Sequence, residues 1–289
     1  MRDVPSATAM LVLNGVAFRS TDPRYSALVS ERARVHSAGL IRAAGERPRN
    51  GRNAFDRAIV GIMEALTVPG LSLHYVLRKR YIEDVLREAI GHDFRQLVVI
   101  GAGLDTVALR LVEQFPALRA IEVDHPATQA LKKRLLSAAK IPTTTTFLPL
   151  DLTHATLAET LKACPEFDGN RATLFLAEAV FLYLNEDEVR KALRAIRSVA
   201  SQSRMVFTFF GPRPGRTINF QNATFIADWW LRWRGEPPRW AIEPEMVPTF
   251  LASEGFRTCE VATDASFHRR YVSGQVPLSR GEHIAVAET

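Results

Sequence analysis

The feature that most constrains the fold is the alternation of apolar runs and helix-forming stretches after residue 95. The run QLVVIG at 96–101 is continuously apolar, as expected for a strand covered on both faces in a parallel sheet. Six further strand-like runs follow, at 118–124, 145–151, 172–180, 204–210, 256–263 and 283–289. Helix-like stretches between most of these runs predict an α/β fold, a doubly wound and mostly parallel seven-stranded sheet.

The chain divides into two regions by its pattern of apolar and polar residues. Residues 1–94 are helical in pattern and predict an N-terminal helical cap. The apolar segment TAMLVLNGVAF is interrupted by Asn14 and Gly15, so it predicts a helix of this cap and not a signal sequence. Residues 95–289 predict the α/β domain, with an irregular Trp- and Pro-rich insertion near 211–242. No apolar run approaches the length of a membrane span, so no membrane partner is expected. Two distant cysteines predict neither disulfides nor a metal site and fit the cytoplasm.

The turn after the first strand, GAGLDT, predicts a ligand site at the mouth of a helix. Gly101 and Gly103, with Ala102 between them, allow a sharp turn that a ligand can approach. The third glycine of a dinucleotide site is replaced by Thr106, and Asp105 places a negative charge where a pyrophosphate would lie. Asp105 could equally cap the helix.

Acidic residues also stand at the ends of the next three strands, where doubly wound sheets bind ligands. One of Glu122 and Asp124 is expected to bind a ribose diol, Asp151 to accept from an adenine amino group, and Glu178 to lie near a positive charge. The alternatives are a helix cap at one of Glu122 and Asp124, a helix cap at Asp151, and an arginine partner for Glu178. The ordered series favours S-adenosylmethionine, a cationic nucleoside without phosphate.

Several motifs together resemble the leucine carboxyl methyltransferase family, in the bacterial branch similar to the tetracenomycin polyketide O-methyltransferase. They are LSLHYVLRKRYIEDVL, QLVVIGAGLDTVALRL, IEVDHPATQALKKRLL, FLPLDL and AEAVFLYLNEDEV, in this order. The resemblance implies a Rossmann-like class I fold and a cytoplasmic O-methyltransferase of a carboxylate or hydroxyl on a small molecule or peptide. It implies that Arg78, or its neighbour Arg80, holds the cofactor carboxylate. Further implied contacts are Gly101, Asp124 at the ribose, Asp151 and Leu152 at the adenine, and Glu178 at the methionine end.

The acceptor is not defined by the sequence. A carboxylate acceptor needs no general base, whereas a hydroxyl would, and no catalytic residue is assigned among the candidates His74, His125 and Tyr183. The four tryptophans, all within 229–240, either cover an acidic or aromatic small molecule or simply pack the insertion. The rivals are an NAD(P)-dependent oxidoreductase and a nucleic-acid methyltransferase. The net charge of +6 allows the latter, but the arginines are scattered, so no nucleic acid is expected.

Overall fold

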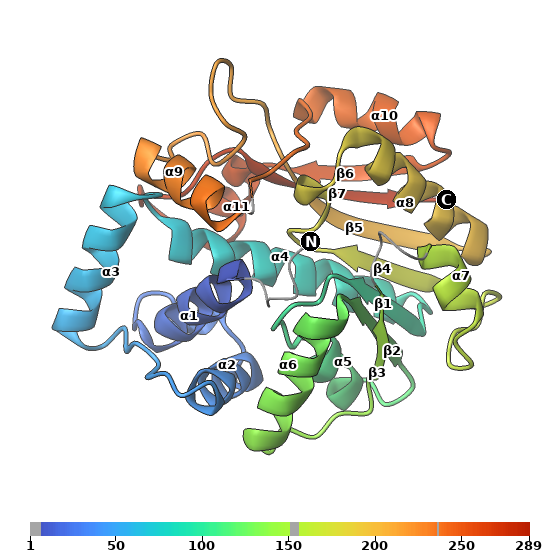
Figure 1. The fold of residues 1–289 in the computed structure, drawn as a ribbon, viewed down its shortest axis with the longest axis horizontal. Coiled ribbons are helices and arrows are strands. Elements are labelled where there is room, and N and C mark those ends of the chain that lie inside the picture. The colour runs from blue at the N-terminus through green and yellow to red at the C-terminus, as the bar shows by residue number, and fades with distance from the viewer. Residues whose placement is uncertain (1–6, 151–155, 236) are drawn as a thin grey trace.

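The predicted doubly wound sheet is confirmed by the structure, a computed structural model that describes residues 7–150, 156–235 and 237–289. Seven strands of the described residues form one sheet in the order β3-β2-β1-β4-β5-β7-β6 (Figure 1). Strands β1 to β5 pair in parallel, whereas β7 is antiparallel to both β5 and β6. The strands are β1 (Gln96–Ile100), β2 (Arg119–Asp124), β3 (Thr146–Pro149), β4 (Thr173–Ala177), β5 (Ser203–Phe210), β6 (Arg257–Ala262) and β7 (Glu282–Glu288).

The helices of the described residues lie mainly between the strands and before the first strand. Before β1 come α1 (Ala7–Thr21), α2 (Glu31–Ala43), α3 (Ala54–Leu66) and α4 (Leu71–Gly91), with a 3-10 turn η1 (Ser26–Leu28). Between strands lie α5 (Val107–Gln114), α6 (Pro126–Ala138), α7 (Leu157–Lys162), η2 (Phe181–Tyr183), α8 (Glu186–Val199), α9 (Phe225–Arg234), η3 (Pro244–Met246), α10 (Val247–Ser253) and α11 (Asp264–Tyr271).

Both faces of the sheet are covered, which explains why its central strands are continuously apolar. Leu97 and Val99 of β1 face a core shared with α4, α5 and α6. Val98 and Ile100, which point the other way, face a second core shared with α7, α8 and α10. Figure 1 shows these helices on opposite sides of the strands.

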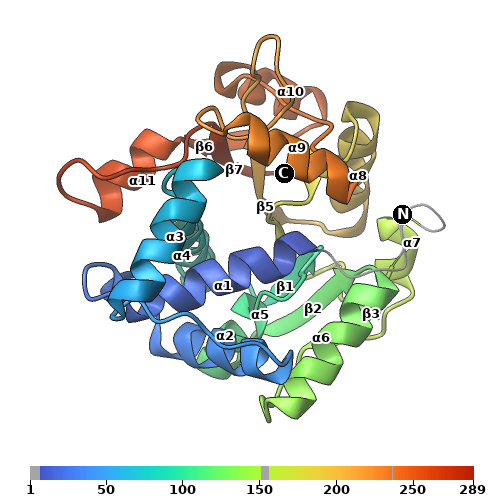
Figure 2. The ribbon, with the colours of Figure 1, turned by 60° about the vertical axis from the view of Figure 1, so that its left-hand side comes forward.

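The helices before β1 reach the carboxyl edge of the sheet. Helix α4 is the most deeply buried of them, with fourteen buried residues, and α1 packs along it. Figure 2 shows α1 passing in front of β1. A Cβ added to Gly103, in the turn after β1, would lie 3.5 Å from Cβ of Ala9 in α1. The N-terminal helices therefore cover the place where the sequence predicts the ligand.

Two differences from the sequence-based expectations concern the second half of the chain. Residues 225–234, inside the stretch expected to be irregular, form α9, and α11 was not expected.

Among the described residues, no single helix is long and apolar enough to cross a membrane; α3 and α4 would pass that test together, but they meet at a bend of 92°. The division into a cap and an α/β domain stays a prediction.

Candidate functional site

The turn between β1 and α5 has the tight geometry that its glycines predict. Gly101 and Gly103 both have positive φ, +64° and +52°, a region that glycine adopts without strain. A Cβ on Gly101 would lie 2.4 Å from Cγ2 of Val180, which follows β4 closely. Ala102 between them is buried. The turn thus brings the ends of β1 and β4 together with room for backbone only.

Asp124, at the end of β2, is bound to this turn. Its Oδ2 accepts a hydrogen bond from the backbone N–H of Gly103 at 2.6 Å, and its Oδ1 accepts from that of His125 at 2.7 Å. Burial raises the pKa of Asp124 above its usual value, although these two N–H groups oppose the shift. No lysine or arginine among the described residues lies within ion-pair distance of Asp124. Its negative charge is therefore stabilised mainly by the two backbone N–H groups, with smaller contributions from the charges of Lys132 and His125.

Glu122, the other ribose candidate, has a different environment. It is 1% exposed, and its Oε2 accepts a hydrogen bond from Nζ of Lys132 in α6 at 2.6 Å. Burial raises the pKa of Glu122 in spite of the lysine. The same Nζ also donates to the backbone carbonyl of Asp105. Glu122 and Lys132 thus form a closed pair beneath the turn, whereas Asp124 stands at its edge.

Glu178 follows β4 and meets two cations from α4. Nε of Arg78 donates to Oε1 of Glu178 at 2.9 Å, Nη2 of Arg78 lies 2.7 Å from the same oxygen, and Nζ of Lys79 donates to it at 3.0 Å. Ala179, the next residue, has φ of +55°, which is unusual for a residue with a Cβ. Its N–H donates to Oγ1 of Thr208 at 2.9 Å, which helps to hold this strained turn.

Arg78 is buried and bridges two carboxylates. Its Nη1 contacts both oxygens of Glu282 in β7 at 2.7 Å, and Nε2 of His74 lies 2.7 Å from one of them. Burial alone would raise the pKa of Glu282, but Arg78 and His74 lower it to about 2. The pKa of Arg78 is correspondingly raised, by Glu282 and Glu178 against the effect of burial. Arg80, the alternative residue predicted to hold the cofactor carboxylate, is instead half-exposed and pairs with Asp84.

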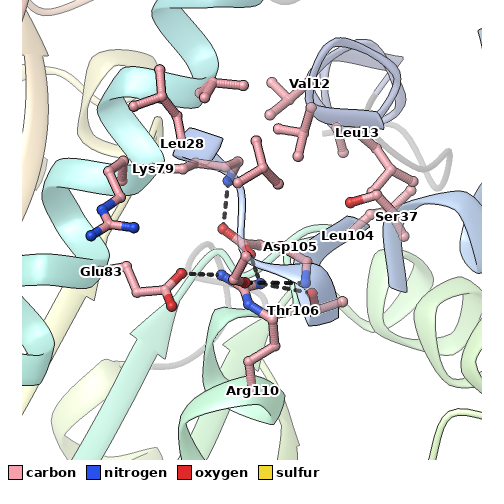
Figure 3. A pocket seen from close by; sticks show the side chains of 17 residues that line it. Val12, Leu13, Leu28, Ser37, Lys79, Glu83, Leu104, Asp105, Thr106 and Arg110 are labelled. Carbon is pink, nitrogen blue, oxygen red and sulfur yellow. Dashed lines mark hydrogen bonds and ion pairs between the residues drawn. The ribbon is translucent and has the colours of Figure 1, made fainter. Parts of the chain in front are cut away.

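Asp105 is the centre of a further cluster of charges (Figure 3). Lys79 donates to its Oδ2 at 2.5 Å, and Arg110 lies 3.8 Å from its Oδ1. The same Oδ1 accepts from the N–H of Val107, the first residue of α5, at 2.8 Å, although Thr106 and not Asp105 occupies the N-cap position of that helix. Burial would raise the pKa of Asp105, but Lys79 and Arg110 hold it well below its usual range. A cavity of about 50 Å³ adjoins this cluster.

The structure therefore brings the predicted residues of the first, second and fourth strand ends to one edge of the sheet. Asp151 and Leu152, predicted at the adenine, lie outside the described residues. Sequence reasoning missed Lys79 and Lys132, which neutralise predicted acids, and Glu282, the buried partner of Arg78. Only the position of Glu282 at the start of an apolar strand could have drawn attention to it.

The arrangement fits S-adenosylmethionine. Asp124, which has no lysine or arginine within ion-pair distance among the described residues, suits the two hydroxyls of a ribose. Gly101 and Gly103 carry no side chain, which leaves their backbone open to close approach by a ligand, and Val180 leaves no room for a Cβ at Gly101. The argument against a dinucleotide from the charge of Asp105 is weaker than the sequence suggested, since Lys79 and Arg110 neutralise that charge.

The strand order, the turn after β1 and the acid that ends β2 define the chain as a class I S-adenosylmethionine-dependent methyltransferase fold. The chain belongs to the leucine carboxyl methyltransferase family, whose model matches residues 19–197. This membership confirms the family predicted from the motifs and, with it, the class of enzyme and its cofactor.

Individual relatives agree with this assignment. The "Putative S-adenosyl-L-methionine-dependent methyltransferase YktD" of Bacillus subtilis is 36% identical over 135 residues, which are 46% of this chain and 44% of that protein. A protein of the same description from Mycobacterium bovis is 29% identical over 248 residues, 78% of this chain and 77% of that one. The match to YktD thus covers less than half of either protein.

Among solved structures, a "putative methyltransferase" of Thermobifida fusca has a TM-score of 0.56 at 19% identity. The superposition covers 86% of this chain and 92% of that chain. This likeness supports the fold.

Proposed function

We propose that this protein transfers the methyl group of S-adenosylmethionine to an oxygen atom, of a carboxylate or hydroxyl, on a small molecule or peptide. The observation that carries the proposal is Asp124: an acid at the end of β2, bonded to the N–H of Gly103 and without a cationic partner among the described residues. The family of the chain supplies the reaction class.

The residue assignments in the proposed site follow from their surroundings. Asp124 would hold the ribose, and the backbone of the turn at Gly101–Gly103 would lie against the cofactor. Glu178 and Arg78 would face the methionine end, as the family resemblance implies. Asp151 and Leu152 keep their proposed place at the adenine on that resemblance alone. Glu122 and Asp105 would act indirectly, because Lys132 and Lys79 already engage their carboxylates.

When bound, the cofactor supplies a methyl group on a sulfonium, which is an activated leaving group. The chain's own residues then have to align the acceptor and exclude water. Apolar side chains suited to excluding water gather beyond the ends of β4 and β5, among them Leu182, Phe210 and Phe220. Tyr75 belongs to the same cluster, and burial raises its pKa, so it stays a neutral phenol near pH 7. A carboxylate acceptor, which carries no proton to remove, fits a site built in this way.

A hollow of about 430 Å³ beyond β5 is the proposed place of the acceptor. Arg239 and Trp240 line it together with Arg213, and the N–H of Arg239 donates to the carbonyl of Leu182 at 2.7 Å. The side chain of Arg239 is about half exposed and lies 3.4 Å from Glu188, whereas Arg213 is buried against Asp228. Arg239 could therefore turn toward an acidic acceptor. This supports the expected acidic or aromatic small molecule.

The first test compares ligands by thermal unfolding. S-adenosylmethionine and its demethylated product should raise the melting temperature, as ligands that bind the native state do, while NADH and NADPH should not. A shift with a dinucleotide alone would refute the proposed cofactor site.

The second test identifies the acceptor. A panel of carboxylic acids and phenols is incubated with the protein and the cofactor, and methyl esters or ethers are detected by mass spectrometry. Arg239→Gln should raise the KM for an acidic acceptor without changing the affinity for the cofactor. Arg134→Gln, which alters an exposed arginine on α6, is the matched control. Equal KM values for both variants would contradict the placement of the acceptor.

A further inference from the structure

Helices α3 and α9 together expose an apolar surface, which we call the α3–α9 face. It presents Phe55, Ile62 and Leu66 of α3 and Phe225, Trp229 and Trp233 of α9, each between 54 and 75% exposed. Single exposed apolar side chains are ordinary on protein surfaces, but a group of this size marks a contact site. In α3 only Asp56 is buried, so nearly the whole helix lies outside the core.

The two helices form one surface. The N–H of Thr224, which caps α9, donates to the carbonyl of Thr67 at 2.8 Å, and its hydroxyl donates to the carbonyl of Leu66 at 2.7 Å. The end of α3 therefore meets the start of α9, and Figures 1 and 2 both show the helices as neighbours. Leu66 and Phe225 stand on the two sides of this junction. On α9, the rings of Trp229 and Trp233 stack at 6.1 Å.

The acidic residues of both helices are turned inward. Asp56 accepts from the N–H of Asn50 at 2.8 Å. Glu64 bonds to the N–H of Ser72 at 2.7 Å, on α4. Asp228 is held by Arg213 and by other buried donors. None of these carboxylates contributes charge to the α3–α9 face.

The exposed charges of the two helices are all basic. They are Arg57 on α3 and Arg232 and Arg234 on α9. The guanidinium of Arg234 lies 5.1 Å from the ring centre of Trp233. Within the described residues of the two helices, the α3–α9 face thus combines an apolar centre rich in tryptophan with exposed arginine and no exposed acid, the composition of helices that bind in the interfacial region of a bilayer.

We propose that the α3–α9 face binds the surface of an anionic lipid bilayer. Tryptophan and phenylalanine would insert among the headgroups, and the arginines would meet lipid phosphates and carboxylates. A second copy of the chain fits this face less well, because a two-fold contact would set the same arginines against one another. The proposal requires no spanning segment, and it revises the expectation of no membrane partner, which considered spanning segments alone.

Sedimentation of the full chain with vesicles tests the proposal. Binding is expected to vesicles that contain phosphatidylglycerol, to weaken with salt, and to be far weaker with phosphatidylcholine alone. The emission of the exposed tryptophans should shift to the blue on binding. Arg232→Gln/Arg234→Gln should weaken binding by more than tenfold, since each basic residue contributes about fivefold near an anionic surface. Trp229→Ser/Trp233→Ser should abolish the spectral shift.

Matched controls change similar residues elsewhere. Val35→Ser alters an apolar side chain of α2 that is 51% exposed, and Lys133→Gln/Arg134→Gln removes two exposed charges from α6. Both should bind vesicles as the unchanged protein does. Light scattering measures whether the protein is a monomer or a dimer in solution. A dimer that dissociates in the Trp229→Ser/Trp233→Ser variant would overturn the proposal, because a second copy of the chain would then occupy the α3–α9 face. Equal binding to neutral and anionic vesicles, or no binding at low salt, would also overturn it.

Discussion

Replacing Arg78 with alanine should destabilise the fold as well as the proposed cofactor site. Arg78 contacts both oxygens of Glu282 and one oxygen of Glu178, and the side chains of Arg78 and Glu282 are 3% and 2% exposed. The sequence alone suggested that this residue serves only the ligand. In the structure its removal leaves buried carboxylates without their main partner, which typically costs 3–5 kcal/mol.

The pKa of Glu282 gives a second estimate. Folding lowers it from 4.5 to about 2, and at about 1.4 kcal/mol per unit this corresponds to roughly 3 kcal/mol of stability. Because the folded pKa lies below the unfolded one, this contribution is complete above about pH 4.5 and is lost as the pH falls toward 2. Without Arg78, burial should raise the pKa of Glu282 and let it protonate on mild acidification.

The assay is urea unfolding of the unchanged protein, Arg78→Ala and Arg80→Ala between pH 7 and pH 4. Arg78→Ala should lose about 3 kcal/mol at pH 7, and the loss should shrink toward pH 4. Arg80→Ala removes only a half-exposed pair with Asp84 and should lose about 0.5 kcal/mol or less at any pH. A loss below about 1 kcal/mol for Arg78→Ala, or one that does not change with pH, would refute the reasoning.

Three further outcomes are expected. Asp124→Asn should weaken binding of S-adenosylmethionine about tenfold or more in isothermal titration, and it should also cost about 1 kcal/mol of stability, because the amide nitrogen cannot accept one of the two backbone N–H bonds; an unchanged affinity would remove Asp124 from the ribose. Glu122→Gln should instead lower stability by about 3 kcal/mol, since it leaves Lys132 charged and buried, and a normal midpoint would argue against that pair. Gly101→Ala should abolish cofactor binding, because its Cβ would clash and its φ is positive, whereas Gly61→Ala on α3 meets open space and should raise the melting temperature slightly. Equal behaviour of the two glycine variants would contradict the tight turn.

The strands and the turn could be predicted because their signals are local. The apolar run before Gly101 and the acid at Asp124 lie in short stretches whose strand and turn patterns can be read without knowledge of the rest of the chain. The insertion of β7 between β5 and β6 could not be predicted, because strand order depends on pairing between residues distant in sequence.

The charges of the site were harder to interpret. The sequence shows a series of acids and suggests a strongly negative site. In the structure, Glu122 and Glu178 each have a lysine or arginine partner from another element. The partner of Glu122 is ten positions away, but that of Glu178 is a hundred, on a helix whose buried face could not be oriented from its pattern alone. Asp124 differs from them because no lysine or arginine among the described residues lies within ion-pair distance of its carboxylate, and the sequence gives no sign of this.

The place of β7 also sets an order of assembly. Strand β6 pairs with β7 and not with β5, so it can join the sheet only after residues 282–288 have been synthesised. Until then Arg78, made some two hundred residues earlier, lacks Glu282. A nascent chain can thus form β1 to β5 while its helix α4 still carries an incompletely neutralised arginine. Strand β7, which is synthesised after β1 to β6, therefore completes the charge balance beside the proposed cofactor site.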